Sequence, residues 1–384
     1  MGASFALQEP SACSPGAAPL RLQLVLPLPC PPAVVLGVAA PLRVAAALAS
    51  VADRIVFLGD ATPALGVAWR RQLASLGSRC VVTERPLVEV LDAGAPALVL
   101  VPDGMPSSHD LAEFLADAGR RTAPSAWVWS GRTVALYYPD AGQLAAPPGE
   151  PHRVAASSAS WYDLQDSKDL KRAECDILRT LRKETDGYLA HLDRAVSIAL
   201  SRRLLRTPVT PNMITAASLA VGLVGAALLT SPRFATTLAG AMLLWTTCIL
   251  DGCDGEVARL KLLATPFGAW FDVAADTVVH VAVFVALPLH VALRHPSARV
   301  MPAGATLLAG VLLSMLTVWW LLLRHPGRHR GGVELFYERM ASRDFIYVIV
   351  ALAAVGRLDW FLWAAAVGAH AFWLSLCGLS WRRR

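Results

Sequence analysis

The sequence predicts a two-part fold, a soluble α/β domain followed by an all-α membrane domain with six transmembrane helices. Of the 384 residues, 55% are apolar and 17% are charged, whereas soluble domains carry roughly 25% charged residues. The mean hydropathy is +0.47. Long apolar runs lie in the second half of the chain, and charged residues concentrate before residue 210. A single soluble globule is therefore excluded.

The N-terminal residues contain no pattern from which a function can be inferred. Residues 1–20 are rich in Ala, Ser, Pro and Gly without periodicity, which is typical of a disordered tail. Arg21 precedes the mostly apolar residues 22–32, but prolines interrupt this run, so that no basic start precedes an unbroken apolar core. Because a signal peptide needs both a basic start and an unbroken apolar core, we expect no cleaved signal and a cytoplasmic N-terminus.

Residues 21–165 show the alternation of strands and helices that predicts an α/β domain with a parallel sheet. The expected strands cover residues 33–38, 54–58, 79–83, 97–101 and 126–130. The expected helices cover residues 67–76 and 109–118. The following segment, residues 166–206, is predicted to be a linker and an amphipathic helix over residues 188–205 that lies along the membrane surface.

A membrane domain is expected over residues 207–384. Pro208 and Pro211 break the preceding helix, and Asn212 is expected to cap the next one. Each expected transmembrane helix is near the roughly 20 residues that cross a bilayer, the fifth being the weakest. These helices cover residues 212–230, 234–252, 268–293, 301–323, 343–357 and 360–380.

Basic residues favour one orientation of these helices. They crowd residues 202–206, 259–261, 324–343 and 382–384, all at the same predicted side. Positive residues remain on the cytoplasmic side, so we expect a multi-pass cytoplasmic-membrane protein with both termini inside. The net charge of +6 is thus explained by orientation and anionic lipids, and nucleic acid is not an expected partner. The seven cysteines show no zinc or redox spacing.

Four carboxylates carry the chemistry. Asp251 and Asp254 are three residues apart and Asp272 and Asp276 four apart, so each pair lies on one face of its helix. Two helices joined by a short loop would bring all four together. Such a cluster repels itself strongly at membrane depth, which predicts a cation among the carboxylates.

Oxygen ligands without His or Cys favour a hard divalent ion, Mg²⁺ or Mn²⁺, and four aspartates suit a two-metal site that grips a pyrophosphate. Gly255, Ala258 and Gly268 lack bulk, which would let a nucleotide approach the helix backbones. Arg259 offers a guanidinium to phosphate. The pattern therefore indicates phosphoryl transfer at a membrane.

These residues resemble the signature of the CDP-alcohol phosphatidyltransferase family, D-x-x-D-G-x-x-A-R, eight residues, G-x-x-x-D-x-x-x-D, which is met at every fixed position. The resemblance covers residues 185–384. It implies that the four aspartates bind metal and that Asp272 and Asp276 are catalytic. Asp276 would deprotonate the acceptor hydroxyl, which attacks the β-phosphorus of a CDP-linked donor and expels CMP. It further implies a homodimer and a cytidine diphosphate site formed by Gly255, Ala258, Arg259, Gly268, Asn212 and Thr215.

The layout of the whole chain is similar to the fused inositol phosphate cytidylyltransferase and di-inositol phosphate phosphate synthase proteins, on the segments W-Y-D-L, K-E-T-D-G and T-P-V-T-P-N. The resemblance implies a nucleotidyltransferase-like N-terminal domain. Residues 35–43 lack the Gly-rich repeat that binds a nucleotide triphosphate in such domains, so we expect a degenerate domain. The resemblance implies a donor that is CDP-diacylglycerol or a CDP-polyol, and an acceptor that is a polyol or a polyol phosphate such as inositol phosphate.

Several alternatives stay open at this point. Arg206, Arg339 and Arg343 either set the membrane orientation or bind a phosphate of the acceptor. His280 either packs in the bundle or orients Asp276 one turn before it. Two other classes of protein fit the composition: an ion-coupled transporter, which should show repeat symmetry between its halves, and an inactive scaffold, which is expected to lack at least one carboxylate.

Overall fold

A computed structural model describes residues 22–28, 33–49, 52–59, 72, 80–145, 150–157, 160–181, 188–297, 299–318 and 344–381. The chain divides into two compact units. The α/β unit comprises Met1–His191, Ile198–Thr210 and Gly255–Ala269, and the helical unit comprises Leu192–Ser197, Pro211–Asp254 and Trp270–Arg384. The expected tail at 1–20 lies outside the described residues, as does the expected helix at 67–76 except for Gln72.

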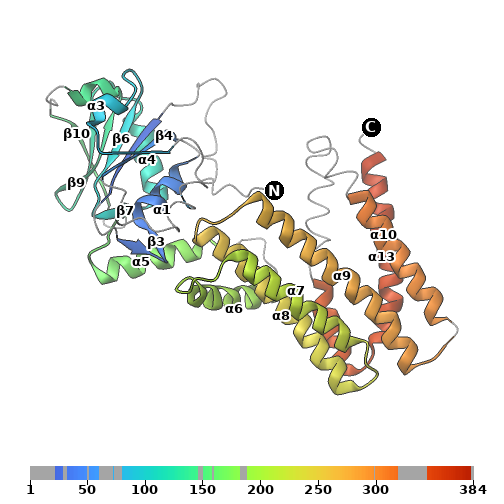
Figure 1. The fold of residues 1–384 in the computed structure, drawn as a ribbon. Helices are drawn as coiled ribbons and strands as arrows, with labels where there is room; N and C mark the ends of the chain where they lie inside the picture. The colour runs from blue at the N-terminus through green and yellow to red at the C-terminus, as the bar shows by residue number, and fades with distance from the viewer. Residues whose placement is uncertain are drawn as a thin grey trace. The chain divides into compact units, whose positions relative to one another are not determined.

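The α/β unit is built on a seven-stranded sheet in the order β10-β8-β9-β6-β1-β4-β5 (Figure 1). Its strands are β1 (Leu22–Pro27), β4 (Ala52–Leu58), β5 (Cys80–Thr83), β6 (Ala97–Leu100), β8 (Ser125–Trp129), β9 (Arg132–Tyr138) and β10 (His152–Ala155). The prediction of a purely parallel sheet is wrong, because β9 runs antiparallel to both β6 and β8. Ser130 and Gly131, with φ of 48° and 79°, form the tight turn that reverses the chain there.

The central strand β1 was not expected, because its sequence reads as a continuous apolar run. Both its faces are covered, and such strands lose the usual alternation of apolar and polar residues. Leu22, Leu24 and Leu26 belong to one hydrophobic core and Val25 to another. The strand expected at 33–38 is instead a small hairpin of β2 (Val34–Val35) and β3 (Val38–Ala39) outside the main sheet.

Helices cover both faces of the sheet. On the face of Leu24 lie α1 (Ala40–Leu48), α4 (Ser108–Ala118) and α5 (Ser167–Arg179), which contribute to the same core. On the face of Val25 lie α3 (Leu87–Val90) and the short 3-10 helix η1 (Ala141–Ala145). A small ribbon of β7 (Gly104–Pro106) and β11 (Trp161–Asp163) completes the layer. The expected helix at 109–118 is confirmed as α4.

The helical unit contains most of the apolar sequence. Its helices are α7 (Pro211–Leu229), α8 (Phe234–Leu260), α9 (Pro266–Arg294), α10 (Val300–Val318), α12 (Asp344–Val355) and α13 (Leu358–Trp381). Five of them are long and apolar enough to cross a membrane, and α12 is shorter. The multi-pass membrane character is thus confirmed. Asn212 does not cap α7, because the helix already begins at Pro211, whose fixed φ and missing N–H suit the first helical position.

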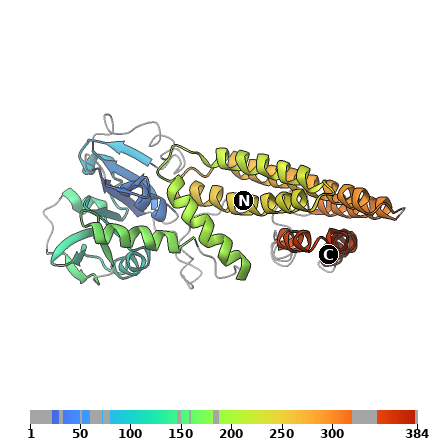
Figure 2. The same ribbon diagram turned by 90° about the horizontal axis from the view of Figure 1, so that it is seen from below.

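Small residues allow α7, α8 and α9 to run close together, as Figures 1 and 2 show. A Cβ added at Gly240 of α8 would lie 2.7 Å from the backbone oxygen of Gly225 on α7. A Cβ added at Gly222 would lie 2.6 Å from a methyl group of Val279 on α9. The close crossing brings the polar residues of these three helices within reach of one another.

Residues of the segment expected to form an amphipathic helix at 188–205 form α6 (Tyr188–Leu204), and its place along the membrane surface stays a prediction. Its Asp193 is buried, and both of its carboxylate oxygens accept hydrogen bonds. Trp245 Nε1 of α8 donates to Oδ1 at 3.0 Å, and the hydroxyl of Tyr347 on α12 donates to Oδ2. A buried carboxylate thereby joins three helices of the helical unit.

Candidate functional site

Two helices place the carboxylates that the sequence singled out. Asp251 and Asp254 lie towards the C-terminal end of α8, and Asp272 lies near the N-terminal end of α9. One carboxylate oxygen from each of these three residues lies within 4.8 Å of the other two. Asp254 is buried and the others are half-buried. The structure therefore clusters three of the four carboxylates that were predicted to converge.

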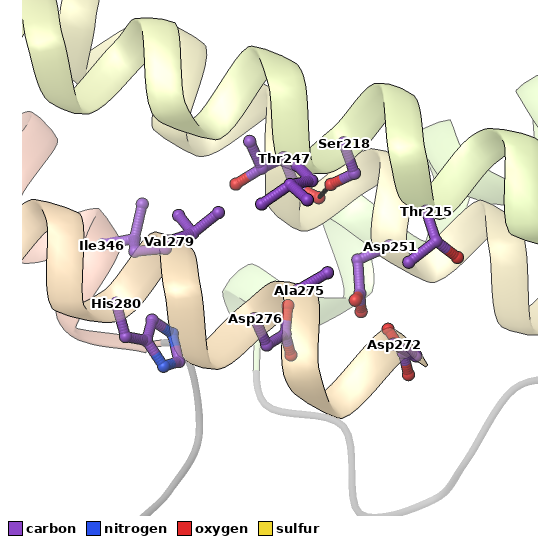
Figure 3. Close-up of a pocket in the computed structure, with 11 residues that line it drawn as sticks. Thr215, Ser218, Thr247, Asp251, Asp272, Ala275, Asp276, Val279, His280 and Ile346 are labelled. Carbon is purple, nitrogen blue, oxygen red and sulfur yellow. Dashed lines mark hydrogen bonds between the residues drawn. The ribbon is translucent and has the colours of Figure 1, made fainter. Parts of the chain in front are cut away.

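The fourth carboxylate stands beside this group. Asp276 lines the same cavity as Asp251 and Asp272, one turn further along α9 (Figure 3). It is not a member of the cluster within 4.8 Å. Asp276 therefore faces the cavity from a position separate from the three clustered carboxylates.

The start of α9 is fixed by its first turn. Thr265 precedes the helix, and its Oγ1 accepts a hydrogen bond of 3.0 Å from the backbone N–H of Gly268. Pro266 occupies the first helical position. A capping Thr followed by Pro is a strong helix start, so the register that places Asp272 and Asp276 on one face is set locally.

A hydroxyl on α7 fixes one of the carboxylates. Thr215 Oγ1 donates a hydrogen bond of 2.5 Å to Asp254 Oδ2, and both side chains are buried. One turn later, Ser218 Oγ donates at 3.3 Å to the backbone oxygen of Thr247 on α8. Sequence reasoning missed Ser218 and Thr247, although Ser218 follows Thr215 at the three-residue spacing of one helix face.

The cavity is small and polar. Its volume is about 10 Å³, close to the space of one water molecule or ion. Asp272 Oδ1 is buried and accepts no hydrogen bond from any residue that the structure describes. A buried carboxylate oxygen without a donor is costly unless a cation is present. The all-oxygen donor set and this orphaned oxygen fit a hard divalent metal ion.

Arg259 and Gly255 lie one turn apart at the C-terminal end of α8. A Cβ added at Gly255 would lie 3.2 Å from Arg259 Nη1, so the guanidinium folds back over the glycine. Ala258 lies beside Arg259 in the same turn and is half-buried. A side chain at position 255 would displace the guanidinium, which gives the glycine of the signature a physical reason.

The remaining predicted site residues are less well defined. Asn212 is half-buried in the first turn of α7. Arg206 is exposed after the end of α6. Arg339 and Arg343 lie outside the described residues, so the predicted acceptor-phosphate pocket stays a prediction.

His280 lines the cavity together with Ile346 of α12. Its ring meets Phe345 edge-on, with 5.2 Å between the ring centroids. The histidine therefore packs against an aromatic ring while it borders the cavity, and the two expectations for it are compatible. No spacing in the sequence indicated that α12 contributes to this wall, because residues 345 and 280 are far apart in the chain.

Comparison with known proteins agrees with the geometry. Residues 208–377 match the CDP-alcohol phosphatidyltransferase family. This segment contains the carboxylates of α8 and α9 and the hydroxyl of Thr215. The resemblance inferred from the signature is thereby confirmed.

Curated proteins are similar to parts of the chain. A bifunctional IPC transferase and DIPP synthase of Rubrobacter xylanophilus is 33% identical over 211 residues, which cover 54% of this chain and 45% of that protein. The Aquifex aeolicus protein of the same name is 33% identical over 160 residues, which cover 41% of this chain and 36% of that protein. The chain thus spans less than half the length of these relatives.

A solved structure is also similar. The crystal structure of Mycobacterium tuberculosis phosphatidylinositol phosphate synthase with CDP-DAG bound is 23% identical in sequence, with a TM-score of 0.41. The similarity covers 49% of this chain and 94% of that one.

Proposed function

We propose that this protein is an integral-membrane CDP-alcohol phosphotransferase that depends on a divalent metal. The observation that carries the proposal is the cluster of Asp251, Asp254 and Asp272. Two of its members, Asp251 and Asp272, line an ion-sized cavity together with Asp276. In the reaction, an acceptor hydroxyl oxygen forms a bond to the β-phosphorus of a CDP-linked donor. The bond between that phosphorus and the bridging oxygen breaks, and CMP leaves with the bridging oxygen.

The roles of the residues follow from their positions. Mg²⁺ or Mn²⁺, as a two-metal site, would be held by the four aspartates and would supply positive charge to the diphosphate. Arg259 offers a guanidinium to the same diphosphate over the bare backbone of Gly255. Ala258, Gly268, Asn212 and Thr215 complete the proposed cytidine diphosphate site, and Thr215 also orients Asp254.

Asp276 is proposed to accept the proton of the attacking hydroxyl. It faces the cavity but stands outside the three-carboxylate cluster, so its oxygens are the ones best placed to face an acceptor. A general base must lie within hydrogen-bond reach of the proton that it removes. His280 borders Asp276 on the same wall and would limit the orientation of its carboxylate.

The substrates are the least constrained part of the proposal. The signature reads the CDP portion, which CDP-diacylglycerol and CDP-polyols share. The acceptor is proposed to be a polyol or polyol phosphate, with inositol phosphate favoured by the similarity to the bifunctional relatives. Arg206, Arg339 and Arg343 are the proposed contacts of an acceptor phosphate. Arg343→Ala should then raise KM for a polyol phosphate and leave KM for the corresponding free polyol unchanged.

The test is CMP release by the purified protein in detergent with Mn²⁺ or Mg²⁺. CDP-diacylglycerol and CDP-inositol are each offered with a panel of polyols and polyol phosphates. We expect metal-dependent CMP release from one pair, its loss in Asp276→Asn, and its retention in the matched control Asp359→Asn, whose carboxylate pairs with Arg357 at the start of α13. No CMP from any pair, despite binding of CDP and metal, would favour the scaffold. Metal-coupled ion flux in vesicles without CDP binding would favour the transporter.

We further propose that the α/β unit is a degenerate nucleotidyltransferase-like domain. Support comes from the sheet order, which reverses direction beside β1, the position where ligands bind in open α/β sheets. The hairpin that follows β1 carries Leu36 and Gly37 at its turn and no glycine-rich phosphate loop. Incubation with CTP and inositol phosphate should therefore release no pyrophosphate, and release of pyrophosphate would contradict degeneracy.

The orientation and assembly are also proposals. Six transmembrane helices, with α12 as the fifth, would leave both termini in the cytoplasm. In intact cells a membrane-impermeant maleimide should then label a cysteine placed at Arg299, between α9 and α10, and should not label the exposed Cys175 of α5. The reverse pattern would invert the topology. The homodimer implied by the family resemblance would appear as twice the protomer mass in light scattering of the detergent-solubilised protein.

A further inference from the structure

The C-terminal end of α8 adopts an unusual form of a common helix stop. Leu263 N–H donates to Ala258 O at 2.9 Å and Leu262 N–H donates to Arg259 O at 3.2 Å. This pair of bonds defines a Schellman motif, in which the penultimate position takes a left-handed conformation and is usually glycine. Here it is Leu262, with φ of 54°. A leucine in this conformation costs roughly 1 kcal/mol and needs compensation from its surroundings.

The Schellman motif leaves the last backbone carbonyls of the helix without partners. Two side chains from distant parts of the sequence donate hydrogen bonds to these carbonyls. Arg43 Nη2 donates to Leu260 O at 2.9 Å, and Gln72 Nε2 donates to Lys261 O at 2.9 Å. All four residues belong to the α/β unit. The end of α8 is thus capped by side chains of the N-terminal domain.

Arg43 is built for this contact. Its side chain is buried, and it also donates to Val35 O at 2.6 Å and Leu36 O at 3.1 Å in the β2–β3 hairpin. Burial lowers the pKa of its guanidinium to about 10, against the raising effect of Glu174, so it stays positively charged at neutral pH. A cation at a helix C-terminus interacts favourably with the helix dipole.

Apolar packing holds the same turn. Leu260 is fully buried within the core that contains the sheet residues Leu24 and Phe57, and Leu262 packs against that core. Burial of the Leu262 side chain explains why this position is not glycine. The side chain of Lys261 binds the segment before α7, because its Nζ donates at 2.7 Å to the backbone oxygens of both Thr207 and Val209.

We infer that the N-terminal domain positions the last turn of α8, and that Arg43 and Gln72 are positioning residues that act through Arg259. This inference rests on the proposed phosphotransferase function, in which Arg259 binds the donor diphosphate. Helix ends fray readily. The hydrogen bonds that close this turn are accepted by the backbone carbonyls of Ala258 and Arg259. Without the cap the turn would open, and the guanidinium would lose its place over Gly255.

The experiment compares Arg43→Ala and Gln72→Ala with a matched control, Arg54→Ala. Arg54 lies on β4 of the same unit and forms an ion pair with Asp92 at its surface. In R43A we expect KM for the CDP-linked donor to rise about tenfold with kcat little changed, because ground-state and transition-state binding are lost together. Q72A should show a smaller rise, and R54A should match the wild type. R43K should recover only part of the loss, since one ammonium cannot span three carbonyls.

A double-mutant cycle separates positioning from general destabilisation. If Arg43 acts through Arg259, R43A should have no further effect on donor KM in the R259A background, because coupled residues are not additive. Equal effects of R43A in both backgrounds would overturn the inference, as would a donor KM unchanged from the wild type in a folded R43A. If R43A does not fold, the same cycle with Q72A decides.

Hydrogen exchange tests the inference independently of turnover. In R43A the amides of Leu262 and Leu263 should exchange about tenfold faster than in the wild type, while amides in the middle of α8 should not change. Unchanged protection at these two amides would overturn the inference. A third outcome separates the two proposals. If these amides exchange faster in R43A but the wild-type protein releases no CMP from any donor, the cap exists and the proposed phosphotransferase function is wrong.

Discussion

Thr215 Oγ1 donates a hydrogen bond of 2.5 Å to Asp254 Oδ2, so that a hydroxyl of α7 orients a carboxylate of α8 within the acidic cluster. One carboxylate oxygen of Asp254 lies within 4.8 Å of a carboxylate oxygen of Asp251 and of one of Asp272. Residues that orient metal ligands are typically worth 10- to 100-fold in metal affinity. The hydrogen bond therefore gives Thr215 a measurable role in orienting Asp254, in addition to its proposed place in the cytidine diphosphate site.

Thr215→Val keeps the shape of the side chain and removes its hydroxyl. We expect the Mn²⁺ concentration for half-maximal CMP release to rise about tenfold, because Asp254 loses the bond that orients it. Calorimetric titration of Mn²⁺ in the absence of substrate should show the same loss of affinity. Thr215→Ser retains a hydroxyl and serves as the control. Equal Mn²⁺ affinity for the Val variant and the wild type would contradict this role.

Because the acidic cluster repels itself, we expect Asp272→Asn to stabilise the metal-free protein and to weaken metal binding. Asp272→Asn removes one of three carboxylates that lie within 4.8 Å of each other. In EDTA the variant should unfold at a higher temperature than the wild type, because like charges at this distance repel strongly in a weakly polar site. Addition of Mn²⁺ should raise the unfolding temperature of the wild type and not that of the variant.

The control for this pair of measurements is Asp359→Asn, which removes a carboxylate of the helical unit outside the cavity. It should leave the Mn²⁺-dependent rise intact. A lower unfolding temperature of Asp272→Asn in EDTA would mean that the cluster does not repel itself in the metal-free protein. A Mn²⁺ response preserved in Asp272→Asn would remove this residue from the metal site.

The sequence predicted the carboxylates of the site because their spacing is local. Asp251 and Asp254 share a helix face by virtue of a three-residue separation, and a short loop brings the next helix back. The hydroxyls of Ser218 and Thr247 could not be predicted in the same way. Their roles depend on how α7 crosses α8, which no periodicity in either helix specifies.

The sheet shows the same limit. The interior strand β1 lacks alternation because both of its faces are buried, so its mostly apolar run shows no strand periodicity. The antiparallel strand β9 was signalled by Ser130 and Gly131, a two-residue turn between two apolar runs. The capping of α8 by Arg43 could not be seen, because 217 residues separate Arg43 from Leu260.

The hydrogen bonds to the buried carboxylate of Asp193 are expected to stabilise the helical unit. Its carboxylate accepts from Trp245 and from the hydroxyl of Tyr347. Asp193→Asn replaces one acceptor oxygen by an NH₂ group, which leaves one buried donor without an acceptor and costs about 1–3 kcal/mol. The free energy of unfolding in detergent, measured by denaturant titration, should fall by this amount. Tyr347→Phe takes one donor from the buried carboxylate and should also lower the free energy of unfolding, by about 1–3 kcal/mol. Unchanged stability of both variants would contradict the role of this network.

Substitution of Gly240 tests whether the close packing of α7 against α8 is needed for stability and for Mn²⁺ binding. A Cβ at this position would lie 2.7 Å from both Gly225 O and Leu229 N, which are backbone atoms and cannot rotate away. Gly240→Ala should therefore separate the two helices and lower the free energy of unfolding by about 1–3 kcal/mol. It should also weaken Mn²⁺ binding, because Thr215 and Asp254 lie on the separated helices. Gly368→Ala on α13 is the matched control, since an added Cβ there meets nothing within 4 Å. Equal stability of the two variants would show that the backbones of α7 and α8 can move apart without cost.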